Sequence, residues 1–495
     1  MILEVSRKQD YIFASKKLRE NAQRSARISH VTSSNYFRAV AGELYQEKEN
    51  LVYAGGGHTI LQFSIPDQAQ HFARRVTWTV MKQFRGLELF VKQMPYDEGK
   101  TPGENLKELT RRLEEKKALR QASFRYTALG VERLSPETFM PQPTEEKPLE
   151  QLVHMLQPPK GYRFPSDFVE LAGKGNFIAV VHVDGNAMGK RVDGVYAAAG
   201  DDWTVCCDKL NRFSVGIQQD FETAFTQTAE ELIRQKYGES KVLPIRPVIL
   251  AGDDVCFVTA GKLGLECARI FLEKLTTLRN QEDQKPYAAC AGVALVHLKY
   301  PFHQAYQLAE ELCSNAKRFG AELDDAGRIS ALDWHIEFGQ LKDHLQQIRR
   351  EYRTEDGGLL SLRPVSVVVP QGCQSVELRT YDFFSCLCQT MQKAYGKIGR
   401  RKIKDLRLAF KQGELESRYF LHDKQMASLL YQGFQSQDQG GRRWELYRQR
   451  LAKGGDLHQE PFHTITCGDR EQRYCLLFDA IEMIDHCEFR KEVEA

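Results

Sequence analysis

The chain has 495 residues, a formal net charge of +3 and 42% hydrophobic residues. This length exceeds one ordinary hydrophobic core, so we expect two or three domains, and the near balance of charge argues against a general nucleic-acid coat. The N-terminal segment lacks a long apolar stretch and no run of about 18 apolar residues occurs, which predicts a cytoplasmic protein without membrane contact. The 12 cysteines are scattered through apolar segments without paired C-x-x-C motifs, so we expect reduced core side chains.

The first part of the chain alternates strand and helix patterns around a glycine turn, Gly55-Gly56-Gly57-His58. In chain order the patterns predict a strand over 2–5, a basic helical region over 11–45, a hairpin over 51–63, a helix over 69–83, a strand over 87–93 and a charged, solvated helix over 105–121. A linker follows over residues 133–169, because seven of the 17 prolines lie in it.

A second series of elements repeats the order of the first. It comprises a strand over 177–183, a helical stretch over 203–237, a hairpin over 247–258, an amphipathic helix over 263–279, a strand over 288–297 and a helix over 305–318. We interpret this repetition as an internal duplication at the level of element order. Hairpins joined through helices to further strands are typical of the ferredoxin-like or palm arrangement, a sheet with helices on one face.

Beyond residue 340 the strand patterns weaken and helices dominate, and the polar, Gly-rich stretch 435–459 is typical of a loop. The sequence therefore predicts an α+β fold with two ferredoxin-like (palm) domains and a C-terminal helical domain. We place the palm domains at residues 1–132 and 170–340, the Pro-rich linker at 133–169 and the mainly helical domain at 341–495.

Carboxylates stand where two predicted strands of the second series end. Asp184 follows the strand 177–183, and Asp253-Asp254 occupy the turn of the hairpin 247–258. In the palm order these strands are neighbours, so the carboxylates would meet. Nucleotidyl transfer needs carboxylates that hold one or two divalent ions, and Mg²⁺ or Mn²⁺ suits an all-oxygen site. Gly185, Gly189 and the amides between them would form a turn that approaches phosphate groups.

Each motif alone is more often an ordinary turn, because Gly, Asp and Asn are the usual turn residues. Here the two motifs stand at strand ends that are one strand-helix-helix-strand unit apart. We therefore favour a catalytic site over two unrelated turns.

Three ordered segments resemble the cyclase palm of the large subunit of type III CRISPR effector complexes, a relative of the GGDEF diguanylate cyclases. These segments are HVDGNAMG at 182–189, PIRPVILAGDDVCFVTA at 244–260 and CAGVALVHLKYPFHQAYQLAEELCSNAKR at 290–318. The resemblance covers roughly residues 170 to 335. In that family the palm makes cyclic oligoadenylate second messengers from ATP, with pyrophosphate released, for antiviral signalling.

By matching positions, the resemblance implies that Asp184, Asp253 and Asp254 are catalytic and hold two Mg²⁺ or Mn²⁺ ions. It also implies that Lys317 in the last helix of the series holds a triphosphate. A single helix lysine is more commonly just solvated, so this role depends on the family match.

The glycines around the carboxylates are expected to contact the nucleotide, together with the residue between two of them: Gly185, Asn186, Gly189 and Gly252. One departure from the family turn is Ala251, which stands where the family has its first glycine. Its methyl group would narrow the nucleotide approach slightly without removing either carboxylate.

The family also carries a first palm that lacks metal ligands, and the turn Gly55-Gly56-Gly57-His58 contains no carboxylate. His58 could contact a nucleotide, although a turn histidine is more often exposed. A nuclease domain of HD type is not expected, because the one His-Asp doublet, His422-Asp423, stands alone near the C-terminus and is interpreted as a surface pair. No zinc knuckle is expected, so the sequence predicts a short form that carries only the cyclase.

Basic residues gather twice in the third domain, once at Lys397, Arg400, Arg401, Lys402, Lys404 and Arg407 and again at Arg442, Arg443, Arg448 and Arg450 with Trp444 and Tyr447 between them. Such clusters bind phosphate backbones or form solvated helix faces, and the second reading is the commoner one. RNA contact, contact with other CRISPR-type subunits through this domain, and a homodimer therefore stay open.

Two other functions compete with the cyclase. The chain could be a scaffold, a non-catalytic or RNA-activated subunit of a guide-RNA ribonucleoprotein. Against a scaffold, three adjacent carboxylates without a metal would repel one another. It could also be a template-directed polymerase with the same palm chemistry, although no fingers domain is apparent.

Overall fold

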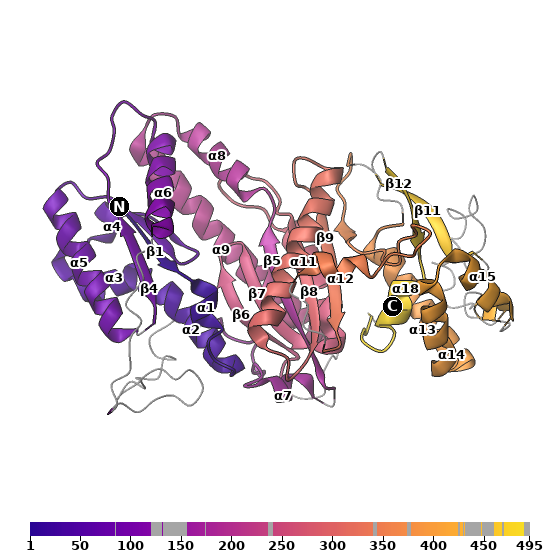
Figure 1. The fold of residues 1–495 in the computed structure, drawn as a ribbon. Coiled ribbons are helices and arrows are strands. Elements are labelled where there is room, and N and C mark those ends of the chain that lie inside the picture. Colours follow the sequence, from indigo (N-terminus) through magenta and orange to yellow (C-terminus); the bar gives the residue numbers. More distant parts are fainter. Residues whose placement is uncertain are drawn as a thin grey trace.

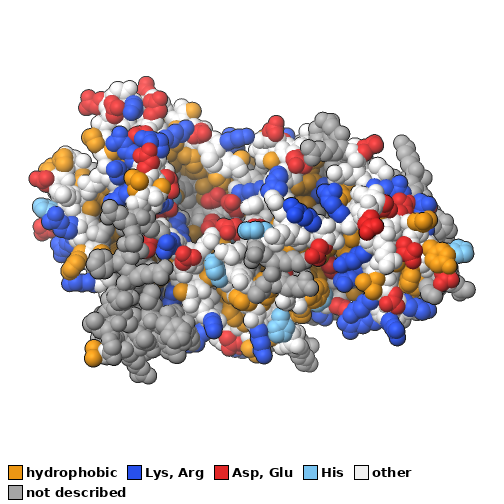
Figure 2. Space-filling model, viewed as in Figure 1, with side chains coloured by type: hydrophobic (Ala, Val, Ile, Leu, Met, Phe, Trp, Pro, Cys, Tyr) orange, Lys and Arg blue, Asp and Glu red, His pale blue; other side chains and the backbone are white. Residues whose placement is uncertain are grey.

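The structure is a computed structural model that describes residues 1–84, 86–119, 131, 156–173, 175–235, 241–339, 344–373, 378–423, 426–428, 430, 447, 460–467 and 470–489. The molecule is elongated, with the N-terminal domain at one end, a second domain in the middle and the C-terminal part at the other end (Figure 1). Lys and Arg side chains are interspersed with Asp and Glu side chains over the face drawn in Figure 2. In the described part of the chain, no helix is both long and apolar enough to cross a bilayer.

The first domain is a four-stranded antiparallel sheet with the strand order β2-β3-β1-β4. Its elements are β1 (Ile2–Ser6), α1 (Lys8–Ile12), α2 (Leu18–Val31), α3 (Ser34–Ala41), η1 (Gly42–Leu44), α4 (Glu47–Asn50), β2 (Leu51–Gly55), β3 (His58–Leu61), α5 (Pro66–Gln83), β4 (Glu88–Lys92) and α6 (Pro102–Ala118). This order is that of the ferredoxin-like fold, as predicted. Each predicted element of this domain is present.

The second domain contains the same four-stranded order, β8-β5-β7-β6, within a six-stranded sheet. Its elements are α7 (Phe168–Ala172), β5 (Phe177–Gly185), α8 (Met188–Ala199), α9 (Trp203–Arg234), β6 (Ile245–Ala251), β7 (Asp254–Ala260), η3 (Gly261–Leu263), α10 (Gly264–Thr277), β8 (Ala289–His297), α11 (Phe302–Leu323) and β9 (Ser330–Glu337). The prediction of two ferredoxin-like domains is confirmed. The prediction did not include α8, because this helix follows a Gly-rich turn at once and has little apolar periodicity.

Helices cover both faces of the second sheet, so the prediction that they lie on one face was wrong. Alternate β5 residues such as Val181 and Val183 pack with α9 and α10 in one core. Ile178 and Val180 point the other way and share a second core with α11 and with residues of the first domain. The strand alternates between two dry environments, which explains its nearly continuous apolar sequence.

The two palm domains pack against each other reciprocally. Helix α9 of the second domain packs on β2 of the first, and the corresponding helix of the first domain, α2, packs on β6 of the second. Helices α1 and α8 correspond as well, since each begins after a residue with positive φ, Arg7 (50°) and Ala187 (54°). Such exchange of equivalent contacts is the mark of an approximate two-fold axis. It supports the predicted duplication with contacts that the sequence does not reveal.

The charged helix predicted over 105–121 is α6, and it is not solvated all round. Thr101 and Glu104 form a capping box at its start. Leu106, Leu109 and Leu113 are buried against the first sheet. The high charge of the other positions conceals this apolar face in the sequence.

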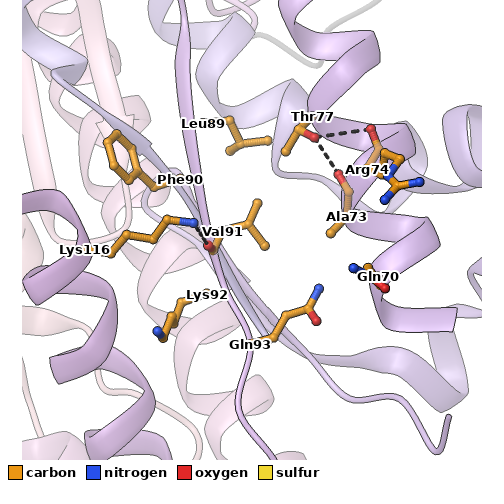
Figure 3. Close-up of a pocket in the computed structure, with 10 residues that line it drawn as sticks. All are labelled: Gln70, Ala73, Arg74, Thr77, Leu89, Phe90, Val91, Lys92, Gln93 and Lys116. Carbon is orange, nitrogen blue, oxygen red and sulfur yellow. Dashed lines mark hydrogen bonds between the residues drawn. The ribbon is translucent and has the colours of Figure 1, made fainter. Parts of the chain in front are cut away.

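The open edge of the first sheet borders a cavity of about 570 Å³ (Figure 3). Residues of α5, β4 and α6 line it, and Lys116 Nζ donates to the carbonyl oxygen of Val91 at 2.8 Å. None of the predicted site residues lies in it. We therefore place the candidate active site elsewhere.

The C-terminal part is mainly helical where it is described, and it also contains a small hairpin. Its elements are α12 (Leu345–Arg350), β10 (Val365–Val368), α13 (Tyr381–Ile398), α14 (Arg400–Lys411), α15 (Glu414–Asp423), β11 (Phe462–Cys467), β12 (Arg470–Cys475) and α18 (Phe478–Met483). Strand β10 pairs with β9, so the second sheet extends past the predicted domain end at residue 340. The Tyr381 hydroxyl donates to Glu266 of α10 at 3.2 Å, and the two parts share one apolar core.

The structure also describes the cysteines, the His422-Asp423 doublet and part of the basic clusters. The 11 cysteines that the structure describes are free, and most are buried, as expected. His422 and Asp423 are both exposed on α15. In the first basic cluster, Arg400, Arg401, Lys402 and Lys404 are exposed on α14. The second cluster apart from Tyr447, the loop 435–459 and most of the linker lie outside the described residues.

Candidate active site

The predicted carboxylates meet at one end of the second sheet. Asp184 in β5 and Asp254 in β7 are direct partners across the antiparallel pair. Asp253 lies in the β6–β7 turn beside them, where Gly252 adopts a φ of 70° that a residue without a side chain tolerates. The palm strand order thus brings together residues that are about 70 positions apart in the chain.

Gly185 allows the turn to approach β5 closely. Its amide donates to the carbonyl oxygen of Asp253 at 3.3 Å. A Cβ atom at this position would lie 2.6 Å from the Met188 side chain and 2.9 Å from Cβ of Asp253. The glycine that was predicted to approach phosphate therefore also has a packing role, which is to make room for the carboxylate turn.

The carboxylates interact unfavourably with one another. Burial, reinforced by the negative charge of Asp184, raises the pKa of Asp253 to about 6. The same causes raise the pKa of Asp254 to about 7, although its side chain is half exposed. Close negative charges in a partly dry site raise pKa values in this way, and such groups are candidates for function.

Lys317 of α11 compensates the charge of Asp184. Its Nζ lies 2.6 Å from Oδ2 of Asp184 and donates to the carbonyl oxygen of Gly185 at 2.8 Å. The helix approaches the sheet closely enough for this contact because Gly292 of β8 lies under it. A Cβ on Gly292 would lie 2.0 Å from the carbonyl oxygen of Ala309.

The other residues predicted to contact the nucleotide, Asn186, Gly189 and Gly252, differ in whether the fold already uses their polar groups. Asn186 turns its side chain to the carbonyl oxygen of Ile329 at 2.8 Å, so its amide is used within the fold. A Cβ on Gly189 in the first turn of α8 would meet no atom within 4 Å, which leaves the space beside it open. The Gly252 amide donates to Oε1 of Gln218 at 2.6 Å.

Gln218 is a site residue that the sequence did not indicate. It lies in α9, accepts from Gly252 and donates to the carbonyl oxygen of Leu250 at 3.1 Å, so it holds both sides of the carboxylate turn. A glutamine within an amphipathic helix carries no sequence signal of its own. Only the packing of α9 under the hairpin reveals this contact.

We expect Gln218→Ala to loosen this turn without unfolding the domain. The substitution leaves the Gly252 amide without its acceptor, at a cost of about 1 kcal/mol. Hydrogen–deuterium exchange of the turn peptide 249–256 should then be about fivefold faster. Gln219→Ala, an exposed neighbour on the same helix, should leave the exchange rate unchanged, and equal rates for both variants would contradict the assignment.

The first domain carries counterparts of this site. Glu4 of β1 pairs with His58 of β3, just as Asp184 pairs with Asp254. In each domain the helix that follows begins four residues after the acidic one. The first palm therefore has a carboxylate at the position equivalent to Asp184, on β1 and outside the glycine turn.

Lysines neutralise this carboxylate. Lys117 Nζ lies 2.6 Å from Glu4 Oε2, and Lys8 Nζ lies 3.5 Å from Oε1. Burial acts to raise the pKa of Glu4, but the hydrogen bond from Lys117 and the charge of Lys8 hold it below its ordinary value. His58 was expected to be exposed, but it is partly buried. Its ring centroid lies 4.7 Å from that of Tyr53, and burial lowers its pKa to about 4.

The two hairpin turns face each other across the domain interface. A Cβ on Gly56 would lie 3.9 Å from the carbonyl oxygen of Ala251, and one on Gly55 would lie 3.4 Å from Oγ of Ser214 in α9. Ala251, the departure from the family turn, is half buried against the core that both domains share. This arrangement places the glycine turn of the first domain opposite the carboxylate turn of the second.

Divalent-ion binding requires a rearrangement of these side chains. Among the described residues, no three His, Cys, Asp or Glu side chains converge closely enough to hold a metal as they stand. Oδ1 of Asp254 is buried without a hydrogen-bond partner, and Lys317 occupies one oxygen of Asp184. Three neighbouring carboxylates, one of them with an unpartnered oxygen, fit a hard cation in their chemistry.

The fold and the site define a paired-palm protein. Residues 177–322 match the family model for the second palm domain of Cas10/Cmr2. The resemblance predicted from the three sequence segments is thereby confirmed over the second domain. A comparison with the curated proteins found no match.

The solved structures to which this chain is similar include type III-A CRISPR assemblies. A chain in the Csm1–Csm4 subcomplex of the type III-A CRISPR-Csm interference complex is 18% identical, with a TM-score of 0.45 over 64% of this chain and 53% of that one. A chain in the apo Csm1–Csm4 cassette is 17% identical, with a TM-score of 0.47 over 85% and 64%. A chain in the cassette in complex with cA4 is 17% identical, with a TM-score of 0.46 over 80% and 62%. The protein thus spans about half to two thirds of the length of these chains.

Proposed function

We propose that the protein is a metal-dependent nucleotidyltransferase that joins ATP, and other nucleoside triphosphates if they fit, into a cyclic oligonucleotide with release of pyrophosphate. The observation that carries the proposal is the register of the second sheet, in which Asp184 and Asp254 are direct partners with Asp253 beside them. The match of residues 177–322 to the Cas10/Cmr2 palm supports it. We propose a role in antiviral signalling on the same basis.

Asp184, Asp253 and Asp254 would hold one or two Mg²⁺ or Mn²⁺ ions. When bound, such ions activate an attacking hydroxyl and stabilise a leaving pyrophosphate. Once Lys317 releases Asp184, its ammonium group would be free to bind the triphosphate of a nucleotide at this site. A lysine ammonium is a common phosphate ligand. In this scheme Lys317 exchanges its carboxylate partner for the phosphate.

The facing turns suggest how two nucleotides could react. One nucleotide beside each turn would aim the 3′-hydroxyl of the first at the α-phosphate of the second, and such orientation lowers the barrier substantially. The lysine-neutralised Glu4 makes the first domain suited to holding a nucleotide without an ion of its own. Chemistry would then take place only at the second turn.

The decisive experiment measures pyrophosphate release by the purified protein with ATP and Mn²⁺, followed by mass spectrometry of products from all four nucleoside triphosphates. We expect pyrophosphate and a cyclic product from the wild type, and at least about a hundredfold less from Asp253→Ala. Equal and negligible release from both proteins would reject the proposal. Extension of a primed template would instead indicate a polymerase.

A scaffold role is the second candidate, and one observation favours it. Lys317 already pairs with Asp184, so the site is partly neutralised without any ion. Under this alternative the protein would be a subunit of a guide-RNA complex, with partner subunits bound through its C-terminal part. Copurification of a small RNA and partner subunits from an inactive protein would support it.

A further inference from the structure

Two buried polar atoms next to the carboxylate turn face each other without a hydrogen bond. They are Nδ1 of His182 and Oδ1 of Asp254, which lie 3.6 Å apart. Neither atom has a hydrogen-bond partner among the described residues, and both are shielded from solvent. An unpaired buried polar atom destabilises a fold, so two such atoms this close together call for an explanation.

The fold places His182 permanently beside the site. It lies two residues before Asp184 on β5 and therefore on the same face of the sheet. Its side chain is only 7% exposed. The Tyr306 ring of α11 packs edge-on against it, with the ring centroids 5.4 Å apart. The imidazole therefore has little freedom to turn elsewhere.

Asp254 has two distinguishable oxygens. Oδ1 is buried and directed at His182, whereas the side chain as a whole is 49% exposed. The exposed surface therefore belongs to the rest of the carboxylate.

We propose that His182 is a positioning residue for Asp254: its Nδ1–H donates to Oδ1 and thereby directs the other carboxylate oxygen to a divalent cation. The inference rests on the proposed function, because it assigns a role within the same site. A shift of roughly half an ångström brings the pair within hydrogen-bond distance. Partners of this kind orient metal-binding carboxylates, and their loss typically weakens metal binding about 10- to 100-fold.

Three substitutions of His182 differ in where they leave an N–H donor. His182→Asn keeps an N–H donor near the position of Nδ1, His182→Gln moves it to the position of Nε2, and His182→Leu removes it. His335→Phe is the matched control, because His335 is a buried histidine of β9 whose Nδ1 also lacks a partner, away from the carboxylate turn.

The measurement is the affinity of the nucleotide-free protein for Mn²⁺, read by electron paramagnetic resonance, with thermal unfolding as the test of folding. We expect His182→Leu and His182→Gln to bind Mn²⁺ about 10- to 100-fold more weakly, and His182→Asn and His335→Phe to bind it within about threefold of the wild type. If His182→Leu does not fold, the comparison of Asn with Gln decides. A KM for Mn²⁺ that rises while kcat at saturating Mn²⁺ stays within about threefold would accompany this result.

The outcomes separate this inference from the proposed function. Wild-type affinity in both His182→Gln and His182→Leu, with pyrophosphate still released, overturns the role of His182 and leaves the proposed function intact. Loss of affinity in His182→Asn equal to that in His182→Gln also overturns it, because the position of the donor would not matter. A wild-type protein that neither binds Mn²⁺ nor releases pyrophosphate overturns both.

Discussion

Asp254→Asn is expected to abolish pyrophosphate release while it makes the protein more stable. The amide keeps the shape of the side chain but cannot supply the negative charge, so we expect activity to fall by about a thousandfold or more. The stability effect has the opposite sign, because Asp254 is held next to Asp184 in a partly buried position. Functional sites commonly store such unfavourable interactions.

The pH dependence of stability checks this reasoning. Burial and Asp184 raise the pKa of Asp254 to about 7 in the folded state, whereas the unfolded chain releases the proton near its ordinary pKa of about 4. The contribution of this proton to stability is therefore complete below about pH 4 and is lost as the pH rises through 7. Because half of the side chain is exposed, we expect Asp254→Asn to be more stable by about 1 kcal/mol at pH 8, or about 2 °C in Tm.

Thermal unfolding at pH 5 and pH 8 measures the difference. The gain of Asp254→Asn over the wild type should be larger at pH 8. Asp325→Asn, at an exposed aspartate after α11, should change neither stability nor pyrophosphate release. Full activity in Asp254→Asn would rule out its catalytic assignment, and a gain in Tm independent of pH would show that charge is not its cause.

Gly292→Ala is expected to have the largest effect on stability. A Cβ at this position would lie 2.0 Å from the carbonyl oxygen of Ala309 and 2.3 Å from the amide nitrogen of Cys313, both in the backbone of α11. Backbone cannot rotate away as a side chain does, so the helix must move off the sheet. Overpacking of this kind costs about 3 kcal/mol.

The displacement should also reach the site, because Lys317 lies one helical turn beyond Cys313. We expect a lower denaturation midpoint in urea and at least about a tenfold loss of pyrophosphate release. Gly194→Ala is the matched control, since Gly194 is exposed in α8 and a Cβ there meets nothing within 4 Å. That variant should be as stable as the wild type or up to about 1 kcal/mol more stable. Equal midpoints for Gly292→Ala and wild type would contradict the close packing of α11.

Much of the second domain could be predicted because its patterns are strong. The run from Phe177 to Val183 is apolar and β-branched, and its end at Asp184-Gly185 marks both a strand boundary and a candidate site. The helix α8 escaped prediction because no loop separates it from the turn. The additional strand β10 was assigned to another domain, since a four-residue strand carries too little pattern to show which sheet it joins.

The candidate site residues likewise divide into those that the sequence indicated and those that it did not. Asp184, Asp253 and Asp254 were recognisable from the sequence because acidic residues at strand ends are unusual enough to notice together. Gln218 and His182 were not, because an amide in a helix and a histidine in a strand are common, and only their contacts in the structure make them candidates. Glu4 was overlooked because its equivalence to Asp184 depends on strand register rather than on a motif.

The sequence by itself determined the duplicated strand-helix order and the acidic turn, since both depend on local patterns of apolar, glycine and carboxylate residues. The tertiary structure alone decided that the two turns face each other and that Lys317 reaches Asp184. It also decided that Lys117 and Lys8 neutralise the first palm while the second keeps carboxylates with raised pKa values. Charge interactions depend on distances between residues far apart in the chain, and only packing sets those distances.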